Sequence, residues 1–158
     1  ECPVQKIPLL ADVLRLVMRQ TRTRVSMQPK TNCVADAVAL VKAMNAERWV
    51  GFNDGNLQYM SEVKRLAPEV PVFWDRAGNT NIDDDIRTAI KHGFEALVIQ
   101  KDGVTLKKVR KLKAADIEIG AWTVNDGGTM QQLLDMGVER LYTDDPRLLL
   151  TLKSANGE

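Results

Sequence analysis

The sequence is poor in cysteine and histidine and has no long apolar run, and each shortage excludes a class of protein. The two cysteines, Cys2 and Cys33, are too few for a disulfide scaffold and lack the spacing of metal ligands, so they leave the cellular compartment open. No apolar run approaches the roughly 20 residues of a membrane-spanning helix, and the opening ECPVQKIP has no signal-peptide pattern. The formal net charge of +1 argues against binding to nucleic acid or a membrane surface through bulk charge.

What the sequence does contain is typical of one globular domain. Its 158 residues, of which 44% are hydrophobic and 27% charged, are enough to bury a core. No proline- or serine-rich linker and no low-complexity segment divides them. Residues 1–158 are therefore interpreted as a single domain.

Short β-type runs alternate with amphipathic segments along the chain. A helix is expected over 8–20, with Pro8 at its start. Apolar stripes at helical spacing separate the later β-type runs, and Gly93 and Gly137 stand where a left-handed helix C-cap is favoured. Six strands are expected, over 23–27, 48–52, 71–74, 95–100, 117–122 and 139–143.

This strict alternation predicts an α/β fold with parallel strands joined by right-handed crossovers. An open doubly wound sheet normally has a glycine-rich phosphate-binding turn after its first strand, whereas TRVSMQPKTN contains no glycine. A closed TIM barrel has eight strands, and the leading helix here has no strand before it. We therefore expect a TIM (β/α)8 barrel of which this chain supplies about the last six βα units, with the N-terminal two absent.

Polar and aromatic residues follow the expected strands, at the edge where barrels and open α/β sheets bind ligands. Gln28 and Lys30 stand two residues apart after the first strand, so they share one side of an extended run. Trp122 and Asn125 stand at the end of the fifth strand. Trp122 is therefore predicted to form a wall of the ligand pocket, and the Asn125 amide to form hydrogen bonds with the ligand. Such a rim suits a small polar anion, because lysine is a compact charge that stabilises phosphoryl oxygens. The remaining strand ends carry Asn53, Asp54, Trp74, Asp75, Arg76, Gln100, Lys101, Asp102, Thr143, Asp144 and Asp145.

Three further features are interpreted as structural. His92, the only histidine, is expected at a helix C-terminus, where a cation complements the helix dipole, away from the strand ends. Asp83, Asp84 and Asp85 resemble a metal cluster, but acidic residues are favoured in the first turn of a helix. The basic band over 107–113 is expected to be a solvated helix face, with an anionic membrane or nucleic-acid patch as the alternative.

Two motifs near the end of the chain resemble the glycerophosphodiester phosphodiesterase family. WTVND and the later MGVERLYTDDPRLLL are similar to that family's WTVN strand and its G-V-(D/E)-x-x-x-T-D-x-P strand. IPLLADVL resembles the family segment IPTLEEVL, and VSMQPK falls where the family has an I-E-I-K strand. The resemblance covers essentially the whole chain, in the right order and near the right spacing.

The resemblance implies a TIM-barrel hydrolase of lipid metabolism. Such a phosphodiesterase cleaves glycerophosphodiesters to an alcohol and glycerol 3-phosphate. It uses a divalent metal, Mg²⁺ or Ca²⁺, to clamp phosphate oxygens and two histidines as general acid and base. The family's histidines and one acidic metal pair belong to segments with no counterpart in this sequence. We therefore expect these 158 residues alone to be inactive.

The resemblance also assigns individual residues. Lys30 matches the family lysine and Trp122 the pocket tryptophan, and both are expected to contact the substrate. Phe52, in a stretch that approximates the family's S-F-D, and Asn125 are expected to do the same. Gln28 occupies the place of a family glutamate and is the candidate metal ligand, because an amide oxygen can ligate Mg²⁺ or Ca²⁺ without adding formal charge.

Three alternatives stay open on sequence alone. A non-catalytic phosphate- or phosphodiester-binding barrel module would keep the pocket without the chemistry, as glutamine at the glutamate position suggests. An open α/β protein would bind an unrelated ligand such as a dinucleotide or flavin. A barrel completed by another chain or by a homo-oligomer would cover the unpaired strand edges, which are otherwise an aggregation hazard.

Overall fold

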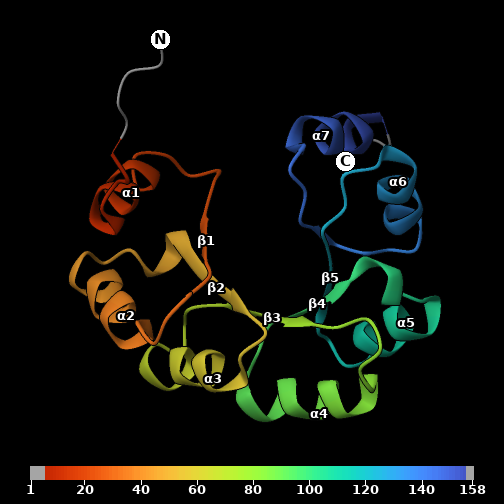
Figure 1. Cartoon of the computed structure of the whole chain (residues 1–158), viewed down its shortest axis with the longest axis horizontal. Coiled ribbons are helices and arrows are strands. Elements are labelled where there is room, and N and C mark those ends of the chain that lie inside the picture. The colour runs from red at the N-terminus through yellow and green to blue at the C-terminus, as the bar shows by residue number, and fades with distance from the viewer. Residues whose placement is uncertain (1–5, 156–158) are drawn as a thin grey trace.

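The computed structural model describes residues 6–155, and its centre is a curled sheet of parallel strands (Figure 1). The strands lie in chain order from β1 to β6, and every neighbouring pair is parallel. A helix lies in each connection, as parallel neighbours require. The predicted α/β alternation is therefore confirmed. The six strands are Val25–Met27 (β1), Val50–Asp54 (β2), Val72–Arg76 (β3), Ala96–Gln100 (β4), Glu118–Trp122 (β5) and Arg140–Leu141 (β6).

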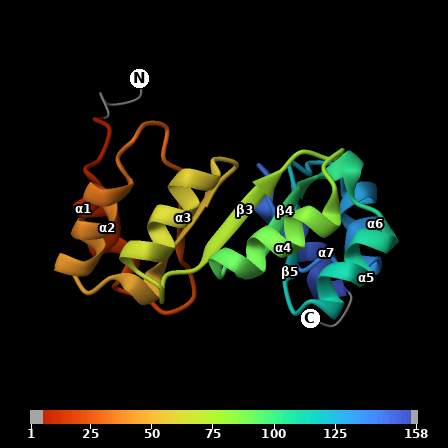
Figure 2. The same cartoon turned by 90° about the horizontal axis from the view of Figure 1, so that it is seen from below.

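The α-helices lie along the outer side of the curled sheet (Figures 1 and 2). Within the described residues, none of them is long and apolar enough to cross a membrane. Two short 3-10 helices, η1 (Glu47–Trp49) and η2 (Lys101–Gly103), precede β2 and follow β4. The α-helices are Leu10–Val17 (α1), Val34–Ala43 (α2), Leu57–Leu66 (α3), Ile82–His92 (α4), Leu106–Ala114 (α5), Gly127–Asp135 (α6) and Pro146–Ala155 (α7).

Local sequence signals fix the ends of these helices. Gly93 and Gly137 have φ angles of +71° and +85°, which glycine adopts without steric cost, and the predicted left-handed positions are confirmed. At five helix N-termini among the described residues a side-chain oxygen accepts a backbone N–H and so satisfies one unpaired donor. The five capping residues are Asn56 (α3), Asn81 (α4), Thr105 (α5), Asp126 (α6) and Asp145 (α7).

Alternate strand residues face two different environments. Outward side chains such as Leu97 and Ile99 join the main buried core, which also contains residues of the surrounding helices. The concave side of the sheet holds a smaller apolar cluster beneath the carboxyl ends of the strands. This cluster consists of Phe73, Ala96 and Val98, with Trp122 and Tyr142 packed against it.

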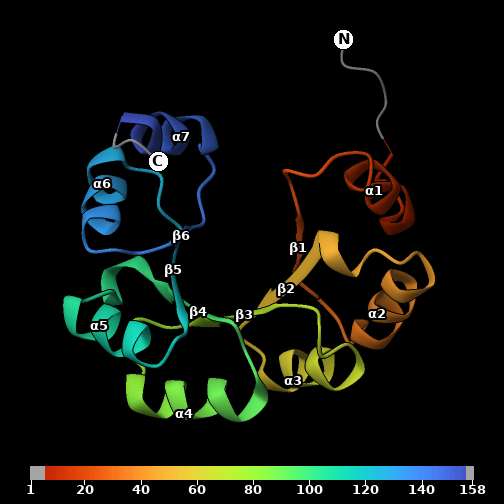
Figure 3. The same ribbon diagram turned by 180° about the vertical axis from the view of Figure 1, so that it is seen from behind.

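The sheet forms an arc of a ring rather than a closed ring (Figure 3). β1 and β6 each have one paired neighbour, and α1 and α7 stand on the two sides of the opening. The arc is tight enough that the guanidinium carbon of Arg140 on β6 lies 3.8 Å from the ring centroid of Phe73 on β3. The fold thus has the form of a partial TIM barrel. That these strands are the last six of eight units stays a prediction.

Candidate functional site

A cavity of about 380 Å³ opens at the carboxyl ends of the strands, and we call it the mouth cavity. Parallel strands bring their carboxyl ends to one edge of the sheet, which is why residues far apart in sequence meet here. Gln28 and Trp122, both predicted to stand at this edge, therefore line one cavity. The full lining is Gln28, Gly55, Asp75, Arg76, Ala77 and Trp122.

Lys30 lies beside the mouth cavity and is tied to its lining. The Lys30 Nζ donates a hydrogen bond of 2.5 Å to the Oε1 atom of Gln28. Both side chains are exposed, so the ammonium group is accessible to a ligand. The segment after β1 thus supplies the positive charge of Lys30, and the amide oxygen of Gln28 holds that ammonium group in place.

Asp75 is the carboxylate of the mouth cavity, and a row of side chains on β1 and β2 holds it in place. Ser26 Oγ donates to Asn53 Oδ1 at 2.8 Å, and Asn53 Nδ2 donates to Asp75 Oδ2 at 3.1 Å. The other oxygen, Asp75 Oδ1, is buried and has no hydrogen-bond partner among the described residues. Burial is the main cause that raises the pKa of Asp75 to about 6; the hydrogen bond from Asn53 and the charge of Lys30 lower it, and the charge of Asp54 raises it.

Trp122 forms part of the cavity wall, as predicted. Its indole Nε1 donates a hydrogen bond of 3.0 Å to the carbonyl oxygen of Val98, one strand away. The ring is half-buried against the concave cluster, and the peptide bond to Thr123 is cis. These contacts hold the aromatic surface at the cavity. Contact with a substrate stays a prediction.

Arg76 lines the cavity but is already neutralised. Its Nε donates to Asp85 Oδ1 at 2.8 Å, and the side chain of Asp85 is only 5% exposed. Thr80 Oγ1 donates to the other oxygen of Asp85 at 2.6 Å. The guanidinium carbon also lies 4.0 Å from the ring centroid of Trp74. Arg76 therefore anchors the β3–α4 connection and adds little net charge to the cavity.

Phe52 does not line the mouth cavity. Its side chain is 1% exposed and belongs to the main core, together with Met60 and Val63 of α3. The next residue, Asn53, faces the concave side, because successive strand residues point to opposite faces. Phe52, which was expected to contact the substrate, instead packs β2 against α3.

Asn125 joins two neighbouring strand ends. Its Nδ2 donates to Asp144 Oδ2 at 2.7 Å, and its Oδ1 accepts from the Asp144 backbone N–H at 2.9 Å. Thr143 Oγ1 donates to the same Oδ1 at 3.2 Å. Both ends of the amide therefore tie the loop after β5 to the loop after β6. Substrate contact by Asn125 stays a prediction.

Apart from Asp85, which pairs with the lining residue Arg76, the residues interpreted as structural lie away from the mouth cavity. His92 ends α4, where its Nδ1 pairs with Ser61 Oγ at 3.0 Å, far from the strand ends. Asp83, in the first turn of α4, forms an ion pair of 2.6 Å with Lys111 of the basic band. Cys33 is half-buried at the start of α2, whereas Cys2 falls outside the described residues.

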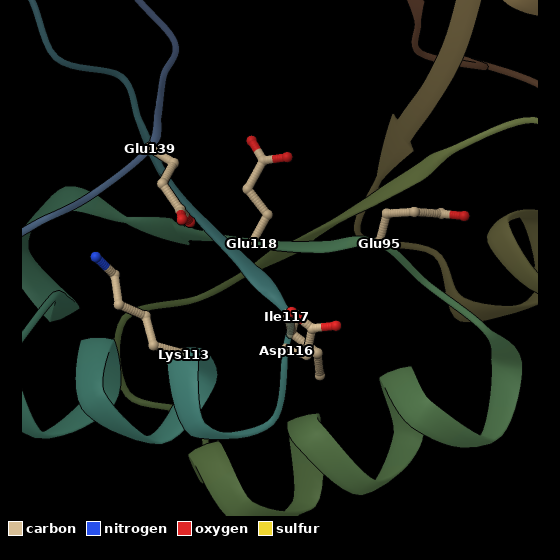
Figure 4. Close-up of a pocket in the computed structure, with 6 residues that line it drawn as sticks. All are labelled: Glu95, Lys113, Asp116, Ile117, Glu118 and Glu139. Atoms are coloured by element: carbon tan, nitrogen blue, oxygen red, sulfur yellow. The ribbon is translucent and has the colours of Figure 1, made fainter.

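A second cavity, of about 480 Å³, lies at the opposite end of the sheet, where the strands begin (Figure 4). Three of its carboxylates already have partners. Glu95 and Glu139 accept the backbone N–H groups of Val72 and Ile119, at 2.7 and 2.9 Å, and Glu118 pairs with Arg140 at 2.9 Å. These contacts link neighbouring strands, so this acidic cavity is interpreted as structural. The lining residues are Glu95, Lys113, Asp116, Ile117, Glu118 and Glu139.

Comparison with known proteins agrees with the motifs in the sequence. The model of the glycerophosphoryl diester phosphodiesterase family matches residues 4–148. A search of curated proteins finds no relative that matches the chain.

Solved structures share the fold at low sequence identity. A glycerophosphodiester phosphodiesterase from Parabacteroides distasonis is 20% identical with a TM-score of 0.81, over 96% of this chain and 66% of that one. One from Agrobacterium tumefaciens is 17% identical with a TM-score of 0.71, over 90% and 61%. A phosphodiesterase from Oleispira antarctica, solved with the product sn-glycerol-3-phosphate, is 17% identical with a TM-score of 0.77, over 93% and 61%. The chain thus spans less than two thirds of each of these structures. From the match over residues 4–148, the chain belongs to the glycerophosphoryl diester phosphodiesterase family.

Proposed function

We propose that this chain forms the phosphate-binding part of a metal-dependent glycerophosphodiester phosphodiesterase, which hydrolyses its substrates to an alcohol and glycerol 3-phosphate. The observation that carries the proposal is one cavity lined by both Gln28, at the end of β1, and Trp122 of β5, with Lys30 hydrogen-bonded to Gln28 beside it. The family match and the product-bound relative support a ligand of this class. Because the chain spans only part of its relatives' length, hydrolysis is proposed for the whole protein.

Lys30 is proposed to bind the phosphoryl group. An ammonium group has three donors, and the hydrogen bond to Gln28 uses one of them. The remaining donors can face a phosphate oxygen, where a charge-assisted hydrogen bond is about twice as strong as a neutral one. Trp122 would then pack against the carbon skeleton of the ligand.

The described residues do not by themselves fit the divalent metal, Mg²⁺ or Ca²⁺, that the family resemblance implies. These cations need several oxygen ligands, yet the Oε1 of Gln28 already accepts from the ammonium of Lys30, whose charge repels a metal ion. Asp75 is the one carboxylate of the lining. Within residues 6–155 no three acidic, histidine or cysteine side chains are grouped to hold a metal. When bound in the whole protein, such a metal would polarise phosphate oxygens.

A pair of histidines, which the family resemblance implies as general acid and base, is the other feature that the mouth cavity lacks. His92 is the only histidine of the sequence, and it lies with Ser61 at the opposite end of the sheet. We therefore propose that the 158-residue chain binds its ligand without hydrolysing it. Hydrolysis of glycerophosphocholine by this chain alone, with Mg²⁺ or Ca²⁺ present, would contradict this.

A non-catalytic phosphodiester-binding barrel module is the second candidate. The observation that favours it is Gln28, a neutral residue bonded to Lys30 where the family has a glutamate. The two candidates differ in what the whole protein does. A whole protein that binds glycerophosphodiesters but hydrolyses none of them with either metal would be the binding module.

Binding of sn-glycerol 3-phosphate, measured by calorimetry at pH 7, tests the role of Lys30. We expect Lys30→Ala to weaken binding by about tenfold or more, the contribution of a hydrogen bond to a charged group. Lys107→Ala is the matched control, because Lys107 is an exposed lysine on α5 away from the mouth cavity. Equal affinities for the wild-type chain and Lys30→Ala would remove Lys30 from the site.

A further inference from the structure

The mouth cavity contains one group that a phosphate site does not need. Asp75 places a carboxylate in a lining that Lys30 and Gln28 make suitable for an anion. Two negative charges in the same small cavity repel each other. A carboxylate that remains there is therefore expected to serve a part of the ligand other than the phosphate.

The neighbouring cations form no ion pair with Asp75 among the described residues. Arg76, the next residue, is bonded to Asp85 and stacked on Trp74. Lys30 donates to Gln28, and among the described residues Asp75 takes part in no ion pair. The carboxylate therefore has no ion-pair partner among the described residues, and the charge of Lys30 lowers its pKa by less than burial raises it.

The environment of Asp75 is one that a cationic ligand group would complete. Burial is the main cause of its raised pKa of about 6, since the surroundings disfavour the ionised form. The hydrogen bond from Asn53 holds one carboxylate oxygen, and the bond from Ser26 to Asn53 holds that amide in turn. A carboxylate fixed in this way, and lacking an ion-pair partner, is a functional-site feature rather than a stabilising one.

Trp122 lines the same cavity from β5. The face of a tryptophan attracts a cation placed over it, and quaternary ammonium groups are recognised in this way. The hydrogen bond from Trp122 Nε1 to the Val98 carbonyl fixes the indole. A carboxylate and a fixed tryptophan in one lining are thus complementary to an alkylammonium group.

We infer that Asp75 and Trp122 form a head-group subsite for an alkylammonium cation, so that the chain selects zwitterionic glycerophosphodiesters. The inference rests on the proposed function, because the phosphate at Lys30 brings the head group to the subsite. The negative phosphate then faces Lys30 and the positive nitrogen faces Asp75. Ser26 and Asn53 act as positioning residues for the carboxylate.

Ligand preference measured by calorimetry on the 158-residue chain at pH 7.5 tests the inference. The probes are glycerophosphocholine and glycerophosphoethanolamine, whose head groups are cationic, and glycerophosphoglycerol, whose head group is uncharged. We expect the wild-type chain to bind the two zwitterionic diesters about tenfold more tightly than glycerophosphoglycerol. Asp75→Asn should abolish this preference and leave the affinity for glycerophosphoglycerol unchanged or slightly higher, because a repulsive charge is removed.

The control is Asp102→Asn, which removes a carboxylate from an exposed position at the end of β4, outside the lining. This variant should keep the wild-type preference. Equal binding of all three diesters, or a preference that survives Asp75→Asn, overturns the head-group subsite and leaves the Lys30 site standing. If no diester and no sn-glycerol 3-phosphate binds the wild-type chain, the proposed function itself fails and the subsite fails with it.

Discussion

At the scale of single residues, Asp75 is a carboxyl group whose ionisation the fold opposes. Its pKa rises from 3.8 to about 6 because the carboxyl group is largely removed from water. The hydrogen bond from Asn53 compensates only one oxygen. Such a residue lowers stability at neutral pH, which is expected where a site is arranged for a ligand rather than for the fold.

The free energy of unfolding should therefore depend on the state of Asp75. Between pH 4 and 6 the folded chain holds the proton more tightly than the unfolded chain, so stability falls as pH rises through this window. We expect a loss of about 2 kcal/mol, after allowance for solvent screening of a partly exposed group. Asp75→Asn should remove this loss and be more stable than the wild-type chain at pH 8. Urea unfolding from pH 4 to 8 measures it, with Asp102→Asn as the charge-matched control. A wild-type curve parallel to that of Asp75→Asn would show that Asp75 titrates normally.

The sequence predicts the edge of the sheet at which a residue lies more readily than it predicts the hydrogen-bond partner of its side chain. Gln28 and Trp122 were placed at the ligand edge because chain order and strand alternation determine which edge a strand end reaches. Phe52 was misplaced, although its distance of two residues from Val50 puts both on the core side of β2. The bond between Asn53 and Asp75 depends on the register of β2 against β3. A shift of two residues would leave every side chain on the same face, so the alternation pattern does not identify the partner of Asn53.

At the scale of elements, the connection between β3 and α4 positions one side of the mouth cavity. Arg76 at the end of β3 and Asp85 in α4 form the ion pair, and Thr80 in the loop donates to the same carboxylate. The loop also passes close to the next connection. A Cβ atom added to Gly103 would lie 2.0 Å from the Cα of Gly78, so neither position has room for a side chain.

Replacing Asp85 should loosen this connection. Asp85→Asn leaves the partly buried guanidinium of Arg76 without its counter-charge, and we expect a loss of about 3 kcal/mol in the free energy of unfolding. Asp84→Asn is the matched control on the same helix, because Asp84 forms an exposed ion pair with Arg87 that contributes less than about 1 kcal/mol. Chemical denaturation of the two variants compares them directly. Losses of similar size would contradict a specific role for the buried pair.

The strands and α-helices were predictable as elements, whereas the two 3-10 helices and the element boundaries were not. All six expected strands are present, but β2 begins at Val50 rather than residue 48, because η1 occupies the preceding turn. The first helix was expected over 8–20 and spans Leu10–Val17. It ends early because Gln20 Nε2 donates to the Val17 carbonyl at 2.6 Å and satisfies a helix-end acceptor. Such local hydrogen bonds are invisible to hydrophobic periodicity.

At the scale of the whole molecule, the arc of the sheet leaves two strand edges. The alternation of strand and helix was sufficient to predict parallel strands in chain order, because right-handed crossovers permit little else. What covers the edges could not be predicted from periodicity. Two large apolar side chains stand on the helices beside the opening, Leu16 of α1 at 66% exposed and Leu150 of α7 at 63%. Unpaired strand edges flanked by apolar residues are favourable surfaces for association.

We expect the 158-residue chain to self-associate through this opening. Sedimentation velocity should give a mass that rises with concentration from that of the monomer toward that of the dimer. The double variant Leu16→Lys with Leu150→Lys should shift the equilibrium toward the monomer, because charges on the two helices beside the opening oppose burial of the edges. Leu106→Lys is the matched control, since Leu106 is 51% exposed but lies on α5 away from the opening. A wild-type chain that stays monomeric at every concentration would mean that the open edges are stable in water. An effect of Leu106→Lys as large as that of the double variant would place the contact elsewhere on the molecule.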